Sequence, residues 1–412
     1  MIDAFRLIVG EHLARSLRGR PRGSPVTLLF QTAEIRGFPG NRSETSDGKT
    51  DIKSARGPGD LWDNPLGTDG FEFVEYSTPD PAAMAALFER LGFRAVAKHR
   101  SKAVTLFRQG DINFILNDEP DSHAARFADV HGPCACAMAL RVKDAGAAYE
   151  HALAQGVRGV PSQTGPMELN IPAIEGIGGA LVYLVDRYGD GDIYEIDFRS
   201  IKGADQHQMG YGLSYIDHLT HNVYQGNMEE WAGYYERLFN FKEVRFFDIE
   251  GKLTGLKSKA MTSPCGKIRI PINESTDNKS QIVEFLEQYN GEGIQHVALG
   301  TGDIFATVEA MRAGGVAFMD TPDTYFEGID ARLPGHGEDV DRLYRNKILI
   351  DGAPADDQGL LLQIFTDTVI GPIFFEIIQR KGNEGFGEGN FQALFDSIEA
   401  DQVRRGVLED KA

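Results

Sequence analysis

Three residues of metal-binding type stand out in this sequence because each lies in its own apolar, strand-like segment. They are His218, His296 and Glu376, spaced about 80 residues apart. Two imidazoles and one carboxylate on one face of a metal form the ligand set of non-haem Fe(II) oxygenases, which leaves coordination positions open for a substrate and dioxygen. The sequence therefore predicts an iron site, with one Fe(II) per chain.

Each of these residues also has a simpler interpretation. A single histidine in an apolar strand is more often a hydrogen-bonded core residue than a ligand. Glu376 fits that interpretation less well, because its neighbours are phenylalanine and isoleucine and burying an unpaired carboxylate costs several kcal/mol. A metal ion would offset that cost. Since strand side chains alternate, His218 and Thr220 should share one face, and His221 should lie on the other in a structural role.

The segments that must position these residues are repeated. Residues 137–157 align without a gap with residues 296–316. Each stretch reads as a strand, an aspartate at a helix start, an alanine-rich helix and a glycine just after its end. We expect residues 61–200 and 213–380 to be two copies of one larger unit, joined by a linker at 201–212. Each unit should contain two modules of a strand, a helix and several further strands.

The same alignment indicates which copy holds the metal. Ala137 takes the place of His296, and no histidine lies near Phe73, where His218 should fall. Only one of the three ligands has a matching residue in the first unit, because Glu195 corresponds to Glu376. One carboxylate cannot hold a divalent ion alone, so we expect the first unit to be free of metal.

Further polar and aromatic residues lie in apolar segments near the candidate ligands. The polar residues could pair with backbone groups, and the aromatic residues could be ordinary core, but an aromatic substrate would need both kinds of wall. The polar group is Ser258, Asn273, Gln281, Gln295 and Gln363, and the aromatic group is Phe365, Phe374, Phe386 and Phe391.

Composition excludes several classes of protein. The chain has 412 residues, of which 42% are hydrophobic and 25% are charged, as is usual for a globular protein with two domains. The net charge of −19 argues against a nucleic-acid partner. Apolar runs stay well below the roughly 20 residues of a membrane span. Three cysteines without a CxxC pair suit the reducing cytoplasm.

The two ends differ from the middle. Residues 1–60 contain an arginine-rich stretch and then a polar one, and we expect a disordered extension. Residues 381–412 combine a glycine-rich stretch with a helical pattern over 391–405, for which Asn390 could be the N-cap. Glycines leave the backbone free to pivot, so we predict a hinge and a helix that closes over the site.

Taken together, these motifs closely resemble the 4-hydroxyphenylpyruvate dioxygenase family, across about residues 60–406. The family has the vicinal-oxygen-chelate fold. The resemblance thus implies an α+β protein like the glyoxalases and extradiol dioxygenases, with four βαβββ-type modules in two domains, each forming an open barrel-like sheet. The motifs are Ile216-Asp-His-Leu-Thr-His-Asn-Val, Pro271-Ile-Asn-Glu, Gly293-Ile-Gln-His-Val-Ala-Leu, Leu361-Leu-Gln-Ile-Phe-Thr, Phe375-Glu-Ile-Ile-Gln-Arg and Gly385-Phe-Gly-Glu-Gly-Asn-Phe.

The resemblance also implies roles for residues. His218, His296 and Glu376 match the family's iron ligands, and the five polar residues match its pocket. Phe365 and Phe386 match the pair that holds the substrate ring. Further wall positions are Phe374, Phe391 and Leu394.

The implied reaction converts 4-hydroxyphenylpyruvate and O2 to homogentisate and CO2, in tyrosine and phenylalanine breakdown. A homodimer or homotetramer in the cytoplasm is expected. Two alternatives remain. Hydroxymandelate synthase shares the substrate, metal and fold, but typically has a smaller aliphatic residue in place of Phe365. A metal-free binding module of the same fold is the other alternative, and the intact triad argues against it.

Overall fold

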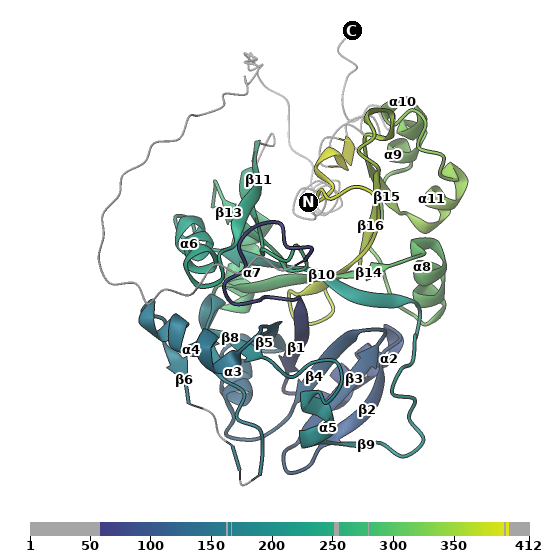
Figure 1. Cartoon of the computed structure of the whole chain (residues 1–412). Coiled ribbons are helices and arrows are strands. Elements are labelled where there is room, and N and C mark those ends of the chain that lie inside the picture. The colour runs from purple at the N-terminus through teal and green to yellow at the C-terminus, as the bar shows by residue number, and fades with distance from the viewer. Residues whose placement is uncertain are drawn as a thin grey trace, which may run out of the picture.

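A computed structural model describes residues 58–161, 164–165, 167–250, 255–278, 280–390 and 393–394. Most of the predicted N-terminal extension and most of the predicted C-terminal helix lie outside these residues. The described chain forms two curled sheets of similar design. In Figure 1 the N-terminal half occupies the lower part of the view, the C-terminal half occupies the upper part, and β10 and β14 cross between them.

The N-terminal half is built on a nine-stranded sheet with the order β6-β7-β8-β5-β1-β4-β3-β2-β9. Its first module and the following helix are β1 (Phe71–Ser77), α2 (Pro81–Arg90), β2 (Arg94–His99), β3 (Val104–Gln109), β4 (Ile112–Asn117) and α3 (His123–His131). Its second module and the last elements are β5 (Cys134–Arg141), α4 (Ala145–Ala154), β6 (Gly159–Val160), β7 (Ala173–Glu175), β8 (Leu181–Val185), α5 (Ile193–Asp197) and β9 (Phe198–Ser200).

The C-terminal half repeats the design in an eight-stranded sheet with the order β11-β12-β13-β10-β14-β17-β16-β15. Its first module and the following helix are β10 (Leu213–Val223), α6 (Met228–Phe239), β11 (Lys242–Glu250), β12 (Gly255–Thr262), β13 (Arg269–Ser275) and α7 (Gln281–Tyr289). Its second module comprises β14 (Gly293–Thr301), α8 (Ile304–Ala313), α9 (Asp323–Glu327), α10 (Ile329–Arg332), α11 (Val340–Asn346), β15 (Leu349–Gly352), β16 (Leu360–Phe365) and β17 (Phe374–Lys381).

The order strand, helix and three strands thus occurs four times, which confirms the predicted fold class. The helix signals of the repeat are confirmed as well. Asp144 and Asp303 cap α4 and α8 by accepting a backbone N–H three residues on. Gly156 and Gly315 follow the two helices with positive φ, a conformation that costs glycine little. No helix among the described residues is long and apolar enough to cross a membrane.

The two halves share a core. The rings of Phe114 in β4 and Phe375 in β17 stack with centroids 5.8 Å apart. The chain before β1 also reaches the C-terminal half, since the backbone N–H of Leu61 donates to the carbonyl of Pro264 and the indole N–H of Trp62 donates to that of Asn240. Residues 60–69 therefore connect the halves, rather than acting only as the start of the first unit.

Candidate metal centre and substrate pocket

Three neighbouring strands bring the predicted ligands together. In the register of β10 and β14, Thr220 lies opposite His296 and His218 lies opposite Ala298. Ala298 in turn lies beside Glu376 in the parallel pair of β14 and β17. His218, His296 and Glu376 consequently project from one face of the sheet, and their donor atoms all lie within 4.8 Å of one another.

The donor atoms are arranged around the carboxylate. The Nε2 of His218 lies 3.2 Å from Oε2 of Glu376, and the Nε2 of His296 lies 3.5 Å from the same oxygen. Adjacent ligands at about 2.1 Å from a six-coordinate ion would lie about 3 Å apart. His218 and Glu376 are each only 3% exposed. Imidazole nitrogens and a carboxylate in a shielded pocket therefore fit a divalent transition metal such as Fe(II).

Hydrogen bonds at the other ring nitrogens orient both histidines. The Nδ1 of His218 lies 2.8 Å from Oδ1 of Asp217, and the Nδ1 of His296 lies 3.0 Å from Oε1 of Gln295. Both oxygens can act as acceptors, so a neutral ring with its proton on Nδ1 would present the Nε2 lone pair to a metal. Such partners fix the tautomer and orientation of metal-binding histidines.

The ionisation states of His296 and Glu376 suit a metal. Burial lowers the pKa of His296 to about 4, so its ring is neutral near pH 7. Burial alone would raise the pKa of Glu376, but the neighbouring His218 and His296 outweigh it and hold that pKa at about 2. For His218, burial acts to lower the pKa, but the carboxylates of Glu376 and Asp217 outweigh it and raise the pKa above its usual value.

His221 lies on the opposite face of β10, as predicted from alternation. It is fully buried, and its Nε2 lies 2.7 Å from the hydroxyl of Tyr235 in α6. Thr220 faces the site instead, with its hydroxyl 2.9 Å from Nε2 of His296.

A cavity of about 60 Å³ opens beside the three candidate ligands. Six of the other predicted site residues line it: Ser258, Asn273, Gln295, Phe365, Phe374 and Phe386. The ring of Phe374 stacks on His296 with centroids 4.8 Å apart, and Phe386 meets His218 edge-on at 5.5 Å. Additional walls come from Thr220, Phe247, Leu256, Pro271 and Glu388. The cavity therefore combines aromatic walls with neutral hydrogen-bonding groups beside the candidate metal centre.

Family models match both halves of the chain. Residues 62–199 match the model described as "Hydroxyphenylpyruvate dioxygenase, HPPD, N-terminal", and residues 215–330 match the "Glyoxalase/Bleomycin resistance protein/Dioxygenase superfamily". A "4-hydroxyphenylpyruvate dioxygenase" of Pseudomonas aeruginosa is 62% identical over 348 residues, which cover 84% of this chain and 97% of that protein. The chain belongs to the 4-hydroxyphenylpyruvate dioxygenase family.

The chain is also similar to proteins with other names. "Hemolysin VllY" of Vibrio vulnificus is 63% identical over 84% of this chain and 98% of its own length. Among solved structures, a "xylose isomerase-like TIM barrel/4-hydroxyphenylpyruvate dioxygenase fusion protein" matches with a TM-score of 0.69 at 34% identity. That match covers 81% of this chain and 53% of the fusion.

Three of the predicted pocket residues that the structure describes, Gln281, Gln363 and Leu394, are not among the residues that line the cavity. Gln281 begins α7 and is buried. Gln363 is fully buried in β16, where its side chain lies against Gly387. Leu394 is also buried, and Phe391 lies outside the described residues.

The glycine-rich stretch of this dioxygenase family member is closely packed. A Cβ atom added at Gly387 would collide with Gln363, and one added at Gly389 would collide with Asp351. Helical geometry already begins at residue 388, so the proposed N-cap at Asn390 is wrong. The Asn390 side chain instead accepts a 2.6 Å hydrogen bond from the hydroxyl of Tyr325. These glycines allow close approach of the backbone to its neighbours.

The proposed match of Glu195 to Glu376 is also wrong. Ala139 lies beside Tyr183 in the pair of β5 and β8, as Ala298 lies beside Glu376. Tyr183 is thus the structural counterpart of Glu376, whereas Glu195 is an exposed residue of α5. The counterpart of His218 is Phe73, which lies opposite Ala139. The N-terminal half of this dioxygenase family member consequently has Phe73, Ala137 and Tyr183 at the three ligand positions.

Proposed function

We propose that this protein is an Fe(II)-dependent dioxygenase that converts 4-hydroxyphenylpyruvate and O2 to homogentisate and CO2. The observation that carries the proposal is the close cluster of His218, His296 and Glu376 in the lining of an aromatic pocket. Bound iron would supply the activation of dioxygen and the oxidative decarboxylation of the 2-oxo acid. One ion per chain, held by these three residues, is part of the proposal.

The protein's own residues hold and orient the substrate. Phe365, Phe374 and Phe386 offer apolar faces to a phenol ring, and Phe365 and Phe374 meet edge-on with centroids 6.3 Å apart. Ser258 and Asn273 lie opposite each other on β12 and β13, so they can hydrogen-bond the substrate together without adding charge.

Exclusion of water is the second task of the pocket. Apart from the polar groups, the walls beside the triad are aromatic and aliphatic. Such walls keep solvent from the reacting ring and side chain, and they limit side reactions of reactive intermediates. Gln281 and Gln363 are proposed to support this pocket from behind its walls. Phe391 and Leu394 are proposed to contribute to it from the C-terminal segment.

Hydroxymandelate synthase activity is the second candidate, because it would start from the same substrate. The aromatic side chain of Phe365 lies opposite Glu376 in the pair of β16 and β17. A large flat group at this position restricts how the substrate ring can sit relative to the triad. We therefore favour attack on the ring, followed by side-chain migration, over hydroxylation of the benzylic carbon.

Product analysis tests the proposal. Protein loaded with Fe(II) would be incubated with 4-hydroxyphenylpyruvate under air, and the product identified by NMR and mass spectrometry. We expect homogentisate to form at the same rate as oxygen is consumed. The His296→Ala variant should give no product. Accumulation of 4-hydroxymandelate would favour the second candidate, and the absence of both products would contradict the proposal.

The biological setting is also a proposal. Homogentisate formation would place the protein in tyrosine and phenylalanine breakdown in the cytoplasm, as a homodimer or homotetramer. Light scattering coupled to size-exclusion chromatography would give the oligomeric state, and cell fractionation would give the compartment.

A further inference from the structure

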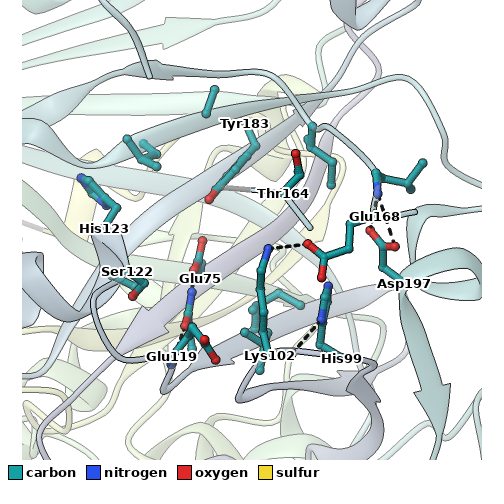
Figure 2. A pocket seen from close by; sticks show the side chains of 18 of the residues that line it. Glu75, His99, Lys102, Glu119, Ser122, His123, Thr164, Glu168, Tyr183 and Asp197 are labelled. Carbon is teal, nitrogen blue, oxygen red and sulfur yellow. Dashed lines mark hydrogen bonds and ion pairs between the residues drawn. The ribbon is translucent and has the colours of Figure 1, made fainter. Parts of the chain in front are cut away.

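A second cavity, larger than the metal pocket, lies among the described residues of the N-terminal half, away from the candidate metal centre. It measures about 230 Å³, compared with about 60 Å³ for the metal pocket. Figure 2 shows polar side chains pointing into it from several strands and loops. Its walls are otherwise apolar and include Phe73, Ile115, Leu181 and Phe198. At the rim, Thr164 is exposed, so the cavity opens to solvent.

This cavity occupies the same place in the N-terminal sheet as the metal pocket does in the C-terminal sheet. Phe73 and Tyr183, the counterparts of His218 and Glu376, both line it. Asn117 lines it as well, at the end of β4, as Asn273 lines the other pocket from β13. The repeat has thus kept a pocket at this position while replacing all three candidate metal ligands.

The feature that points to a ligand is the carboxyl group of Glu75. Glu75 is 5% exposed and lies in β1 among apolar neighbours. Its Oε1 accepts a 2.5 Å hydrogen bond from Asn117, and no described residue forms an ion pair with it. In Figure 2 the carboxyl group of Glu75 and the hydroxyl of Tyr183 point toward the same part of the cavity. Burial raises the pKa of Glu75 by more than the hydrogen bond from Asn117 and the charge of Lys102 lower it, so the protein alone stabilises its negative charge incompletely.

The cationic side chains around the cavity have other partners. Lys102 forms a 3.0 Å ion pair with Glu168, and Arg126 donates a 2.6 Å hydrogen bond to the carbonyl of Asp121. Figure 2 shows the Lys102 ammonium directed at Glu168. A buried carboxylate with one neutral partner and a facing cavity is suited to a cation that enters from solution. The net charge of −19 would also favour the approach of a cation.

We propose that this cavity binds a small aromatic amine, with the ammonium group at Glu75 and the ring among the apolar walls. The rings of Phe73 and Tyr183 lie 5.5 Å apart at 50°, so they form a corner beside the carboxyl group. Aromatic faces attract ammonium groups through cation–π interactions. Asn117 holds the Glu75 carboxyl in place, and the Tyr183 hydroxyl can accept a hydrogen bond from the same ammonium.

Calorimetric titration of the full chain with three ligands tests the proposal. The ligands are 2-phenylethylamine, 2-phenylethanol and phenylacetate, which share a ring and differ in charge. Each is titrated into the wild type, Glu75→Gln and Glu150→Gln. Glu75→Gln keeps the size of the side chain and an oxygen for Asn117. Glu150→Gln removes the same charge from an exposed position on α4.

We expect the wild type and Glu150→Gln to bind the amine equally. Glu75→Gln should bind it at least tenfold more weakly, which corresponds to about 1.4 kcal/mol. The alcohol should bind more weakly than the amine to the wild type, and the acid should bind most weakly. Undiminished amine binding by Glu75→Gln would overturn the proposal, as would tighter binding of phenylacetate or no amine binding at millimolar concentration. The result is independent of turnover, because Glu75 lies outside the metal pocket.

Discussion

The Nδ1–H of His218 donates a 2.8 Å hydrogen bond to the carboxylate of Asp217, the residue that precedes it in the chain. Asp217 is fully buried, and Arg380 of β17 donates to both of its oxygens, at 2.7 and 2.8 Å. Burial would raise the pKa of Asp217, but its bonds to Arg380 and His218 hold that pKa far below its usual value. Asp217 is therefore ionised, and it links a candidate metal ligand to the strand that carries Glu376.

Replacing Asp217 should weaken metal binding without abolishing it. In Asp217→Asn the acceptor loses its charge, so His218 is held less firmly and is a poorer ligand. We expect Fe(II) affinity to fall by roughly 10- to 100-fold, the usual effect of removing such a partner. Anaerobic Fe(II) titration measures it. Arg380 keeps the carbonyl groups of Asn383 and Gly385 as partners, which should preserve the fold.

The exposed residue Asp129 offers a matched control. Asp129→Asn makes the same chemical change on α3 and should leave Fe(II) affinity unaltered. Equal affinity in wild type and Asp217→Asn would mean that the carboxylate only balances the charge of Arg380.

The sequence contained the signal for the three candidate ligands but not for Asp217. Residue type and the apolar, strand-like context were sufficient to point to His218, His296 and Glu376 as a cluster. Strict alternation would place Asp217 and His218 on opposite faces. A register irregularity between Ile216 and His218 in the pairing of β10 with β14 changes this alternation. Such bulges depend on the partner strand, so a single strand's sequence does not reveal them.

Glu195 was matched incorrectly for a related reason. The gap-free alignment of the two halves covers only the strand and the first helix of their second modules, residues 137–157 and 296–316. Beyond it, the C-terminal half inserts α9, α10 and α11, so the spacing to the last strand differs. The string around Glu195 resembles that around Glu376, yet it forms the short helix α5. Strand pairing, rather than local similarity, identifies Tyr183 as the counterpart.

Replacing His296 of β14 and His221 of β10, which lie on opposite faces of the sheet, should separate metal binding from stability. His296→Ala should abolish Fe(II) binding and turnover, because it removes a ligand. His221→Ala should keep most Fe(II) binding. It should lower the free energy of unfolding by about 2 kcal/mol or more, since the Tyr235 hydroxyl loses its partner and a cavity remains.

Metal analysis of purified protein and urea denaturation give the two readouts. Equal loss of iron in both variants would contradict the assignment of His221 to the structural face.

The side chain at position 365 should decide where the substrate is oxidised. Phe365→Val opens the wall opposite Glu376, so the ring can settle in more than one position. We expect turnover to fall by about tenfold or more, as misplacement of reacting groups commonly causes. A larger share of benzylic hydroxylation should appear among the products, as measured by chromatography with mass detection.

Phe246→Val is the control, since Phe246 lies on β11 with its side chain 47% exposed. It should leave both rate and product unchanged. Pure homogentisate from Phe365→Val would show that other walls determine the site of attack.

Glu75 should make stability depend on pH even without a ligand. Its pKa is raised above the ordinary value of 4.5 by burial. The folded state therefore binds this proton more tightly than the unfolded state. The stability that this tighter proton binding gives the folded state is complete below pH 4.5 and is lost as the pH rises through the folded pKa. Glu75→Gln should accordingly be more stable than the wild type at neutral pH, with the difference shrinking as the pH falls. Denaturant titrations from pH 4 to pH 8 measure this, and a constant difference would contradict the raised pKa.

The C-terminal segment should act as a gate over the substrate. The stretch before it is anchored, because the N–H of Gly389 donates to Asp351 and Asn390 bonds to Tyr325. Phe386 is thereby held against His218 at the pocket wall. Any closing motion would then involve the predicted helix at 391–405 rather than a pivot at the glycines.

A chain that ends at Asn390 keeps the anchors and the three candidate ligands but loses Phe391 and Leu394. We expect Fe(II) affinity to change by less than about threefold, within the range of structural perturbations away from the ligands. Turnover should fall far more, and oxygen consumption should exceed homogentisate formation because water reaches the reacting groups. Parallel oxygen-electrode and chromatographic assays compare the two rates. Near-normal turnover with tight coupling in the shortened chain would mean that the segment only packs against the domain.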